Sequence, residues 1–145
     1  MRSRLVGVLR RDAKMELLKR VPLFAECSKK ELGEIARVSD EMDVGQGSVL
    51  TREGDSGREF FVLVEGVAEV RRKGRKVSTM KPGDFFGEIA LVTKMPRTAS
   101  VTATTDVRVL VITERDFSTL LKHSDEVSRG VAEALAERIA PDLPV

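Results

Sequence analysis

The sequence predicts an α+β fold in which a jelly-roll-like β-roll lies between helices at the two ends of the chain. Apolar residues recur at helical spacing near both ends, and short β-branched segments bounded by glycines fill the middle. The length of 145 residues suits one domain. We therefore expect a single domain over 1–145, with N-terminal helices over 1–40, the roll over 41–113 and C-terminal helices over 114–140.

The first helical region extends over residues 13–38, where apolar side chains recur every three to four positions. Pro22 interrupts this pattern, because proline cannot continue a helix. Ser28 with Glu31 three positions later forms a capping box, so a second helix begins there. Cys27 precedes this cap, and we interpret it as a buried packing residue since no histidine lies near it in sequence.

The middle of the chain changes to β periodicity from about residue 42 to residue 113. Glycines separate the β-branched segments, which is typical of a barrel or a sandwich built from many short strands. The expected strands are Ser48–Thr51, Phe60–Val64, Val67–Arg71, Lys76–Met80, Ser100–Thr104 and Val107–Ile112.

Helical spacing returns after Glu114, first in a short helix and then in a longer one that Pro141 ends. The longer helix has an apolar stripe at four-residue spacing, formed by Val127, Val131, Leu135 and Ile139. This stripe either packs on the domain itself or forms a homodimer contact, and the pattern leaves both open.

Charge is unevenly distributed. Residues 1–20 hold seven basic and two acidic side chains, a net charge of +5 against +2 for the whole chain. This segment suits an acidic partner, a phosphate group or a membrane surface, although a solvated helix face has the same pattern. A second basic run, Arg71–Lys76, has Gly74 in its middle and is typical of a hairpin tip.

Composition narrows the classes of function. A single histidine excludes a multi-histidine metal site, and six phenylalanines without tryptophan or tyrosine are few rings for a nucleic-acid platform. We therefore expect neither a metal nor a nucleic acid bound by this chain itself. No apolar run approaches the roughly 18 residues that span a bilayer. With the single cysteine, this favours a cytoplasmic location.

One motif resembles a catalytic sequence. Residues 54–57 read Gly-Asp-Ser-Gly, similar to the nucleophile segment of trypsin-like serine proteases. That chemistry needs a histidine base, and His123 follows the serine in the chain, opposite to the order in that family. Glycine, aspartate and serine are also the residues that turns prefer. We interpret the segment as a turn and expect no enzymatic activity.

The candidate binding residues lie between residues 84 and 101. Gly87 allows a close approach of the backbone, Glu88 offers a carboxylate acceptor for a sugar hydroxyl, and Arg97 offers a guanidinium fork for a phosphate. The small residues Thr98 and Ala99 let backbone N–H groups reach the same anion. Together these groups suit a sugar phosphate. Alternatively, Glu88 and Arg97 pair with each other and pin the loop.

This stretch, FGEIAL followed after four residues by PRTASV, resembles the phosphate-binding cassette of the cyclic nucleotide-binding domain family. The run GSVLTREGDSGREFFVLVEGVAEV also resembles the family's glycine-bounded strands, and the similarity extends from about Leu17 to Ile139. The resemblance implies an eight-stranded β-roll, a cassette over 84–101 and C-terminal helices that act as a lid.

The resemblance also implies roles for single residues. Glu88 would accept a hydrogen bond from the ribose 2′-hydroxyl, and Arg97 would pair with the cyclic phosphate. Thr98 occupies a position near the phosphate and the purine. The ligand-binding set implied is Phe86, Gly87, Glu88, Ile89, Ala90, Arg97, Thr98 and Ala99 from the cassette, Val70 and Val77 packing on the base, and Leu135 and Arg138 from the lid. For Val70 and Val77, ordinary core packing is the alternative.

The function implied is that of a sensor. It would bind cAMP in preference to cGMP and act, through movement of its helices, on a partner or an attached effector that the sequence does not identify. A homodimer through the C-terminal helix is a further expectation. The alternative is a fragment of a catabolite-activator-like transcription regulator, or of a kinase regulatory subunit, that lacks its output domain.

Overall fold

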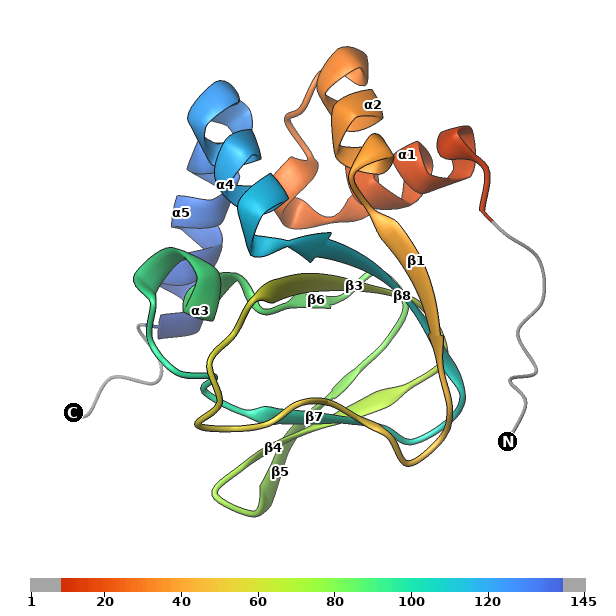
Figure 1. Cartoon of the computed structure of the whole chain (residues 1–145), viewed down its shortest axis with the longest axis vertical. Coiled ribbons are helices and arrows are strands. Elements are labelled where there is room, and N and C mark those ends of the chain that lie inside the picture. Colours follow the sequence, from red (N-terminus) through yellow and green to blue (C-terminus); the bar gives the residue numbers. More distant parts are fainter. Residues whose placement is uncertain (1–8, 140–145) are drawn as a thin grey trace.

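The computed structural model of the chain describes residues 9–139, apart from the side chains of Val92, Arg138 and Ile139. Eight antiparallel strands form two four-stranded sheets, and Figure 1 shows the helices gathered on one side of them. The first sheet has the order β1 (Asp40–Val44), β8 (Val107–Thr113), β3 (Glu59–Glu65) and β6 (Phe85–Phe86). The second has the order β2 (Val49–Thr51), β7 (Ser100–Ala103), β4 (Ala68–Arg72) and β5 (Arg75–Met80). The predicted eight-stranded β-roll is confirmed.

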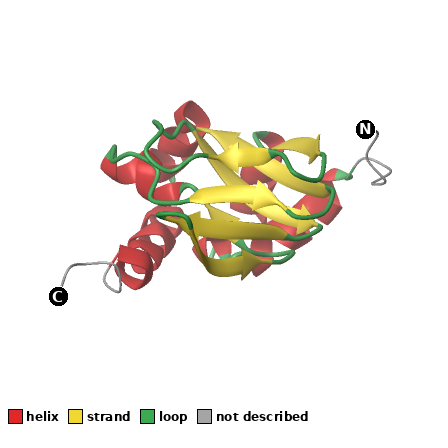
Figure 2. Cartoon of the chain, turned by 90° about the horizontal axis from the view of Figure 1, so that it is seen from below, coloured by secondary structure: helices red, strands yellow, loops and turns green. Residues whose placement is uncertain are grey.

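The helices are α1 (Arg11–Arg20), the 3-10 turn η1 (Pro22–Phe24), α2 (Lys29–Arg37), α3 (Glu88–Thr93), α4 (Glu114–His123) and α5 (Asp125–Ile139). Figure 2 shows the same helices packed against the strands from a second direction. The capping box is present: Glu31 N–H donates to Ser28 Oγ at 3.1 Å, and Ser28 N–H donates to the Glu31 carboxylate at 2.8 Å. Cys27 is a buried free thiol, and burial raises its pKa to about 11. A thiol with that pKa is poorly reactive, as a packing residue should be.

Two apolar cores share the first sheet. Residues of β3 alternate between them: Phe60 and Val62 face the helices, whereas Phe61 and Leu63 face the interior of the roll. Phe60 stacks on Phe117 of α4 with ring centroids 5.2 Å apart. Because β3 is buried on both faces, its apolar residues are consecutive rather than alternating.

The six strands expected from the sequence did not include β1 or the short strand β6, and β6 bears on the site. Its two residues, Phe85 and Phe86, pair with Val62 and Phe61 of β3, and the rings of Phe61 and Phe86 stack at 4.7 Å. Two residues are too few to show periodicity. The strand can therefore be identified only from its pairing with β3. This pairing holds Phe86, the first cassette residue of the candidate site, against the first sheet.

Helix α5 packs against the body of the domain. Val127, Val131 and Ala134 are buried in the core that lies between the helices and the first sheet. Gly130 lies directly on the backbone of Leu23 in η1, so closely that a Cβ there would clash with the Leu23 carbonyl oxygen. The part of the apolar stripe formed by Val127 and Val131 thus packs on the domain itself, which is the first of the two interpretations of the pattern.

Candidate functional site

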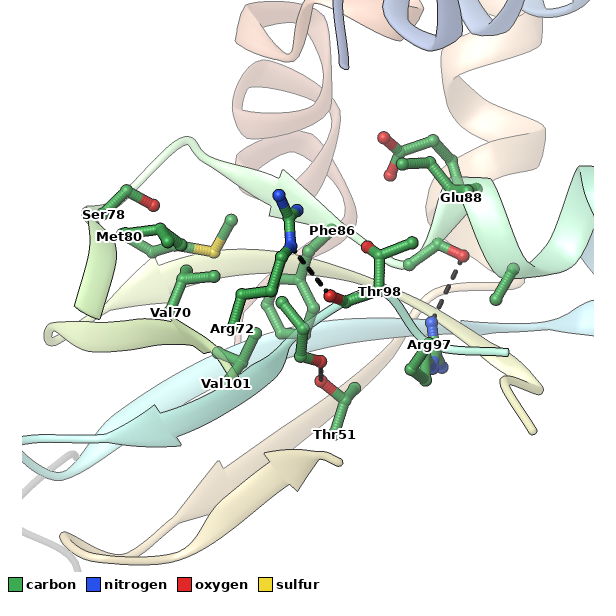
Figure 3. A pocket seen from close by; sticks show the side chains of 15 residues that line it. Thr51, Val70, Arg72, Ser78, Met80, Phe86, Glu88, Arg97, Thr98 and Val101 are labelled. Atoms are coloured by element: carbon green, nitrogen blue, oxygen red, sulfur yellow. Dashed lines mark hydrogen bonds between the residues drawn. The ribbon is translucent and has the colours of Figure 1, made fainter. Parts of the chain in front are cut away.

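A cavity of about 240 Å³ opens between the second sheet and the segment that joins β6 to β7 (Figure 3). Ten of the twelve residues proposed from sequence line it: Val70, Val77, Phe86, Gly87, Glu88, Ile89, Ala90, Arg97, Thr98 and Ala99. Residues far apart in the chain meet here because β4 pairs with both β5 and β7. The cavity has a cassette end, formed by residues 86–90 and 97–99, and a β4–β5 end.

Gly87 shapes the cassette end. Its φ of 105° lies in the region that favours glycine, and a Cβ there would stand 2.6 Å from the Glu59 carbonyl oxygen. The glycine therefore lets the chain turn from β6 into α3 while it touches β3. The same turn directs the Gly87 carbonyl oxygen toward Arg97, whose guanidinium donates to it at 3.3 Å.

Arg97 is buried, with 7% of its surface exposed. Its guanidinium donates to the carbonyl oxygen of Glu59 at 2.8 Å and lies 5.9 Å from the centre of the Phe61 ring. The Glu59 carboxylate is 3.9 Å away. Burial lowers the pKa of Arg97, although the carboxylates of Glu59 and Glu88 act in the opposite direction. The cation is thus held in place largely by neutral carbonyl groups, which do not neutralise its charge.

Glu88 is wholly buried and is the first residue of α3. Its charge acts on Arg97 across the cassette end. Figure 3 shows its carboxylate turned away from the Arg97 guanidinium, whose hydrogen bonds go to the carbonyl oxygens of Glu59 and Gly87. The alternative in which the two side chains pin the loop by a direct hydrogen bond is therefore not the arrangement in this structure.

The β4–β5 end of the cavity is mainly apolar. Val70, Met80 and Val101 are buried and belong to the core of the roll, so their lining and packing roles coincide. Val77 instead is 52% exposed at the mouth of the cavity. Four further residues that line the cavity were not among the ligand-binding residues predicted from the sequence: Thr51, Ser78, Met80 and Val101.

Arg72 also lines the cavity, although the sequence indicated only a basic hairpin tip. The hairpin exists, since β4 and β5 are joined by a turn at Lys73 and Gly74. Arg72, however, is half-buried, and its Nε–H donates to the Thr98 carbonyl oxygen at 3.0 Å. The available signal was its spacing of two from Val70, which places both side chains on the same face of β4.

Neither of the two lid residues proposed from sequence, Leu135 and Arg138, is among the residues that line the cavity in the described part of the chain. Leu135 packs against the core between the helices and the first sheet and is absent from the cavity lining among the described residues. The side chain of Arg138 lies outside the described residues.

Within residues 9–139, no group of three or more histidine, cysteine, aspartate or glutamate side chains is arranged to hold a metal ion. Over the same range, no helix has both the length and the apolar character needed to cross a bilayer.

Comparison with protein families gives a match over residues 41–124 to the model of the cyclic nucleotide-binding domain. A cAMP-dependent protein kinase regulatory subunit from Yarrowia lipolytica is 37% identical over 106 residues, which cover 72% of this chain and 28% of that protein. A cyclic nucleotide-gated potassium channel from Rhizobium etli is 35% identical, covering 85% of this chain and 34% of the channel. The chain thus spans about a quarter to a third of the length of these curated relatives.

Solved structures share the fold. The catabolite activator protein of Thermus thermophilus superposes with a TM-score of 0.77 and 25% identity, covering 83% of this chain and 59% of that one. The regulatory domain of Toxoplasma gondii protein kinase A, crystallised with cAMP, superposes with a TM-score of 0.78 and 26% identity, covering 88% of this chain and 50% of that one.

Proposed function

Because this chain belongs to the cyclic nucleotide-binding domain family, we propose that it is a sensor that binds a cyclic nucleotide in the cavity between its second sheet and α3. We propose cAMP as the preferred ligand over cGMP, since relatives and structural neighbours are named for cAMP. Binding would change the position of the helices and so act on a partner or an attached effector.

The observation that carries this proposal is the burial of Arg97 among carbonyl groups at one end of a cavity. A guanidinium in that setting gains strongly from an anion with paired oxygens, such as a cyclic phosphate. The buried Glu88 carboxylate would accept a hydrogen bond from the ribose 2′-hydroxyl. Backbone N–H groups of Gly87, Ile89, Ala90 and Ala99 would complete the contacts with the sugar phosphate.

The purine would extend toward the β4–β5 end, between Val70 and Val77, with Phe86 and Thr98 beside the ribose and the phosphate. Leu135 and Arg138 remain proposed lid residues. Since Leu135 packs on the helical core here, a lid that includes it requires the end of α5 to move toward the cavity. Such a movement is the signal that an output element would read.

The names of the relatives suggest what kind of protein the proposed sensor domain acts on. Their names include kinase regulatory subunits and a potassium channel, and a structural neighbour is a catabolite activator protein. A regulatory domain that acts through a partner, without catalysis of its own, agrees with these names. A sensor domain of a transcription regulator or of a kinase regulatory subunit is the second candidate, because a kinase regulatory subunit is among the relatives and a catabolite activator protein is a structural neighbour. The cytoplasmic location and a homodimer through α5 remain predictions.

Titration calorimetry of the chain with cAMP, cGMP and 5′-AMP tests the proposal. We expect one site per chain for a cyclic nucleotide and weaker binding of 5′-AMP, whose phosphate is not cyclic. Chromatography of the bound nucleotide should return it unchanged. Absence of binding by both cyclic nucleotides at millimolar concentration would contradict the sensor function, and hydrolysis of the ligand would contradict the non-catalytic role.

A further inference from the structure

The basic run at the tip of the β4–β5 hairpin leads directly to a serine. Residues 71–76 hold five basic side chains, and Arg75 and Lys76 stand three and two positions before Ser78. Many protein kinases select a serine by basic residues at these two positions, because carboxylates of the kinase pair with them. The spacing makes Ser78 a candidate for phosphorylation.

Two other serines have an arginine three positions before them, and the structure distinguishes them from Ser78. Arg97 precedes Ser100, and Arg115 precedes Ser118. Arg97 is buried, and the Ser100 hydroxyl already accepts a hydrogen bond from a backbone N–H group at 2.9 Å. Ser118 is half-buried inside helix α4. A kinase binds its substrate as an exposed, extended segment, and neither serine lies with its arginine on such a segment.

Strand β5 provides this segment for Ser78. It is an outer strand of the second sheet, and five of its six residues, 75–79, are exposed. Figure 1 shows the β4–β5 hairpin projecting from the roll on the side away from the helices. Among the described residues, the side chains of Arg75, Lys76 and Ser78 take part in no hydrogen bond or ion pair. The two recognition charges and the hydroxyl are therefore accessible together.

Ser78 also lies in the wall of the proposed nucleotide cavity. It pairs with Val70 of β4, and Figure 3 shows it at the end of the cavity opposite to Glu88 and Arg97. A phosphoryl group on this serine adds a charge of about −2 and three acceptor oxygens. That group would occupy the end of the cavity assigned to the purine, and its charge would repel an anionic ligand.

Resting on the proposed function for its effect, we propose that Ser78 is phosphorylated by a kinase that selects preceding basic residues, and that the modification prevents cyclic nucleotide binding. Ser78 Oγ forms a bond to the γ-phosphorus of ATP, and the bond from that phosphorus to the oxygen bridging it to the β-phosphate breaks. ADP leaves, and the hydroxyl proton passes to a base of the kinase. Because the two events exclude each other, a bound nucleotide also protects Ser78 from the kinase.

The first test is phosphorylation of the chain by calcium/calmodulin-dependent protein kinase II, which selects an arginine three positions before the serine. Mass spectrometry should locate one phosphate on Ser78, and Ser78→Ala should not acquire it. Arg75→Gln should slow the reaction at least about tenfold, since it removes a charged contact with the kinase.

Arg71→Gln is the matched control for Arg75→Gln. It removes a basic residue of the same hairpin that pairs with the Glu69 carboxylate at 2.7 Å and lies outside the two recognition positions. Its rate should stay within about twofold of the unaltered chain. Absence of phosphate on Ser78, or equal rates for the two arginine variants, overturns the assignment of the site.

The second test compares the Kd of cAMP and of cGMP for the phosphorylated and the unmodified chain by titration calorimetry. Phosphorylation should weaken both at least about tenfold, and removal of the phosphate by a phosphatase should restore the original Kd. A saturating cyclic nucleotide should slow phosphorylation of Ser78 at least about tenfold.

An unchanged Kd after complete phosphorylation overturns the effect on binding. If the unmodified chain binds no cyclic nucleotide, the proposed function fails and the effect on binding fails with it. Phosphorylation of Ser78 is decided separately, by the first test.

Discussion

Arg97 and Arg108 are both buried arginines of the β-roll, and they differ in what surrounds their charge. Arg108 lies on β8 and donates to the two carboxylate oxygens of Asp43 on β1, at 2.7 and 3.1 Å, with Glu41 at 3.6 Å. The hydrogen bond to Asp43 raises the pKa of Arg108. Arg97 is held mainly by carbonyl groups, and burial lowers its pKa.

The difference separates a structural cation from a binding cation. The charge of Arg108 is compensated by carboxylates of its own chain, so the interaction joins β1 to β8. A buried charge whose nearest carboxylate is only in weak contact, as Glu59 is with Arg97 at 3.9 Å, costs free energy of folding, and part of that cost is recovered when an anion binds. Arg97 carries this cost at the edge of a cavity, which is the arrangement that an anionic ligand requires.

Substitution of Arg97 should have the largest effect, and the effect should be on binding. Arg97→Gln removes the charged partner of the phosphate, which we expect to cost about 3 kcal/mol, or roughly a hundredfold in Kd. The free energy of unfolding should change by less than about 1 kcal/mol, because the Glu59 carboxylate lies 3.9 Å from Arg97 and is 47% exposed, so the ion pair that is lost is weak. Titration calorimetry and urea denaturation of the same samples measure both quantities. A large loss of stability with unchanged affinity would make Arg97 a structural residue.

Substitution of Arg108 should give the reverse result. Arg108→Gln leaves Asp43 and Glu41 without their cation, and we expect the free energy of unfolding to fall by about 2 kcal/mol, less than for a fully buried pair because Asp43 is 35% exposed. The Kd for a cyclic nucleotide should stay within about twofold at a temperature where the variant is folded. A Kd change as large as that of Arg97→Gln would remove the distinction between the two arginines.

A substitution at Gly57 offers a smaller perturbation of Arg97. A Cβ at this position would lie 2.6 Å from the guanidinium carbon of Arg97 and 2.6 Å from the Cβ of Ala90. Gly57→Ala should therefore displace Arg97 and weaken nucleotide binding by about 1 kcal/mol, roughly fivefold. Gly45→Ala is the matched control, because a Cβ there meets nothing within 4 Å. Equal affinities of the two variants would show that the position of Arg97 does not limit binding.

The smallest expected effect is on the free energy of unfolding at acidic pH. The hydrogen bond from Arg108 holds the pKa of Asp43 below its ordinary value of 3.8. A depressed carboxylate pKa stabilises the fold fully above that ordinary value, and the contribution is lost as pH falls through the lower folded pKa. The free energy of unfolding of the unaltered chain should thus fall more steeply below about pH 4 than that of Asp43→Asn. Parallel curves for the two proteins would mean that this carboxylate does not contribute.

Much of the fold could be predicted because its signals are local. The capping box at Ser28 and Glu31 and the alternation of the strands depend on residues a few positions apart. The two-residue strand β6 could not be predicted, since it exists only by pairing with β3. The apolar stripe of α5 left open whether Val127 and Val131 pack on the domain or on a second copy, and the structure buries both in the core between the helices and the first sheet.

The candidate site shows the same division. The cassette residues are close together in the chain, so Glu88 and Arg97 could be identified from the resemblance of this short motif to a phosphate-binding cassette. Arg72 was not, because it reaches the cavity through a hydrogen bond to Thr98, 26 residues away. Ser78 and Thr51 come from two further strands, and no sequence signal places them at the cavity.

The class of fold, the order of its elements and the resemblance to a phosphate-binding cassette follow from the amino-acid sequence. These depend on periodicity and on short motifs, which are properties of neighbouring residues. Which arginine lies in close contact with carboxylates depends on how the strands pair. Asp43 meets Arg108 from 65 residues away because β1 pairs with β8, whereas Arg97 comes to rest on the carbonyl groups of β3 and Gly87. Strand pairing sets these distances, and so it decides which charge is available to a ligand.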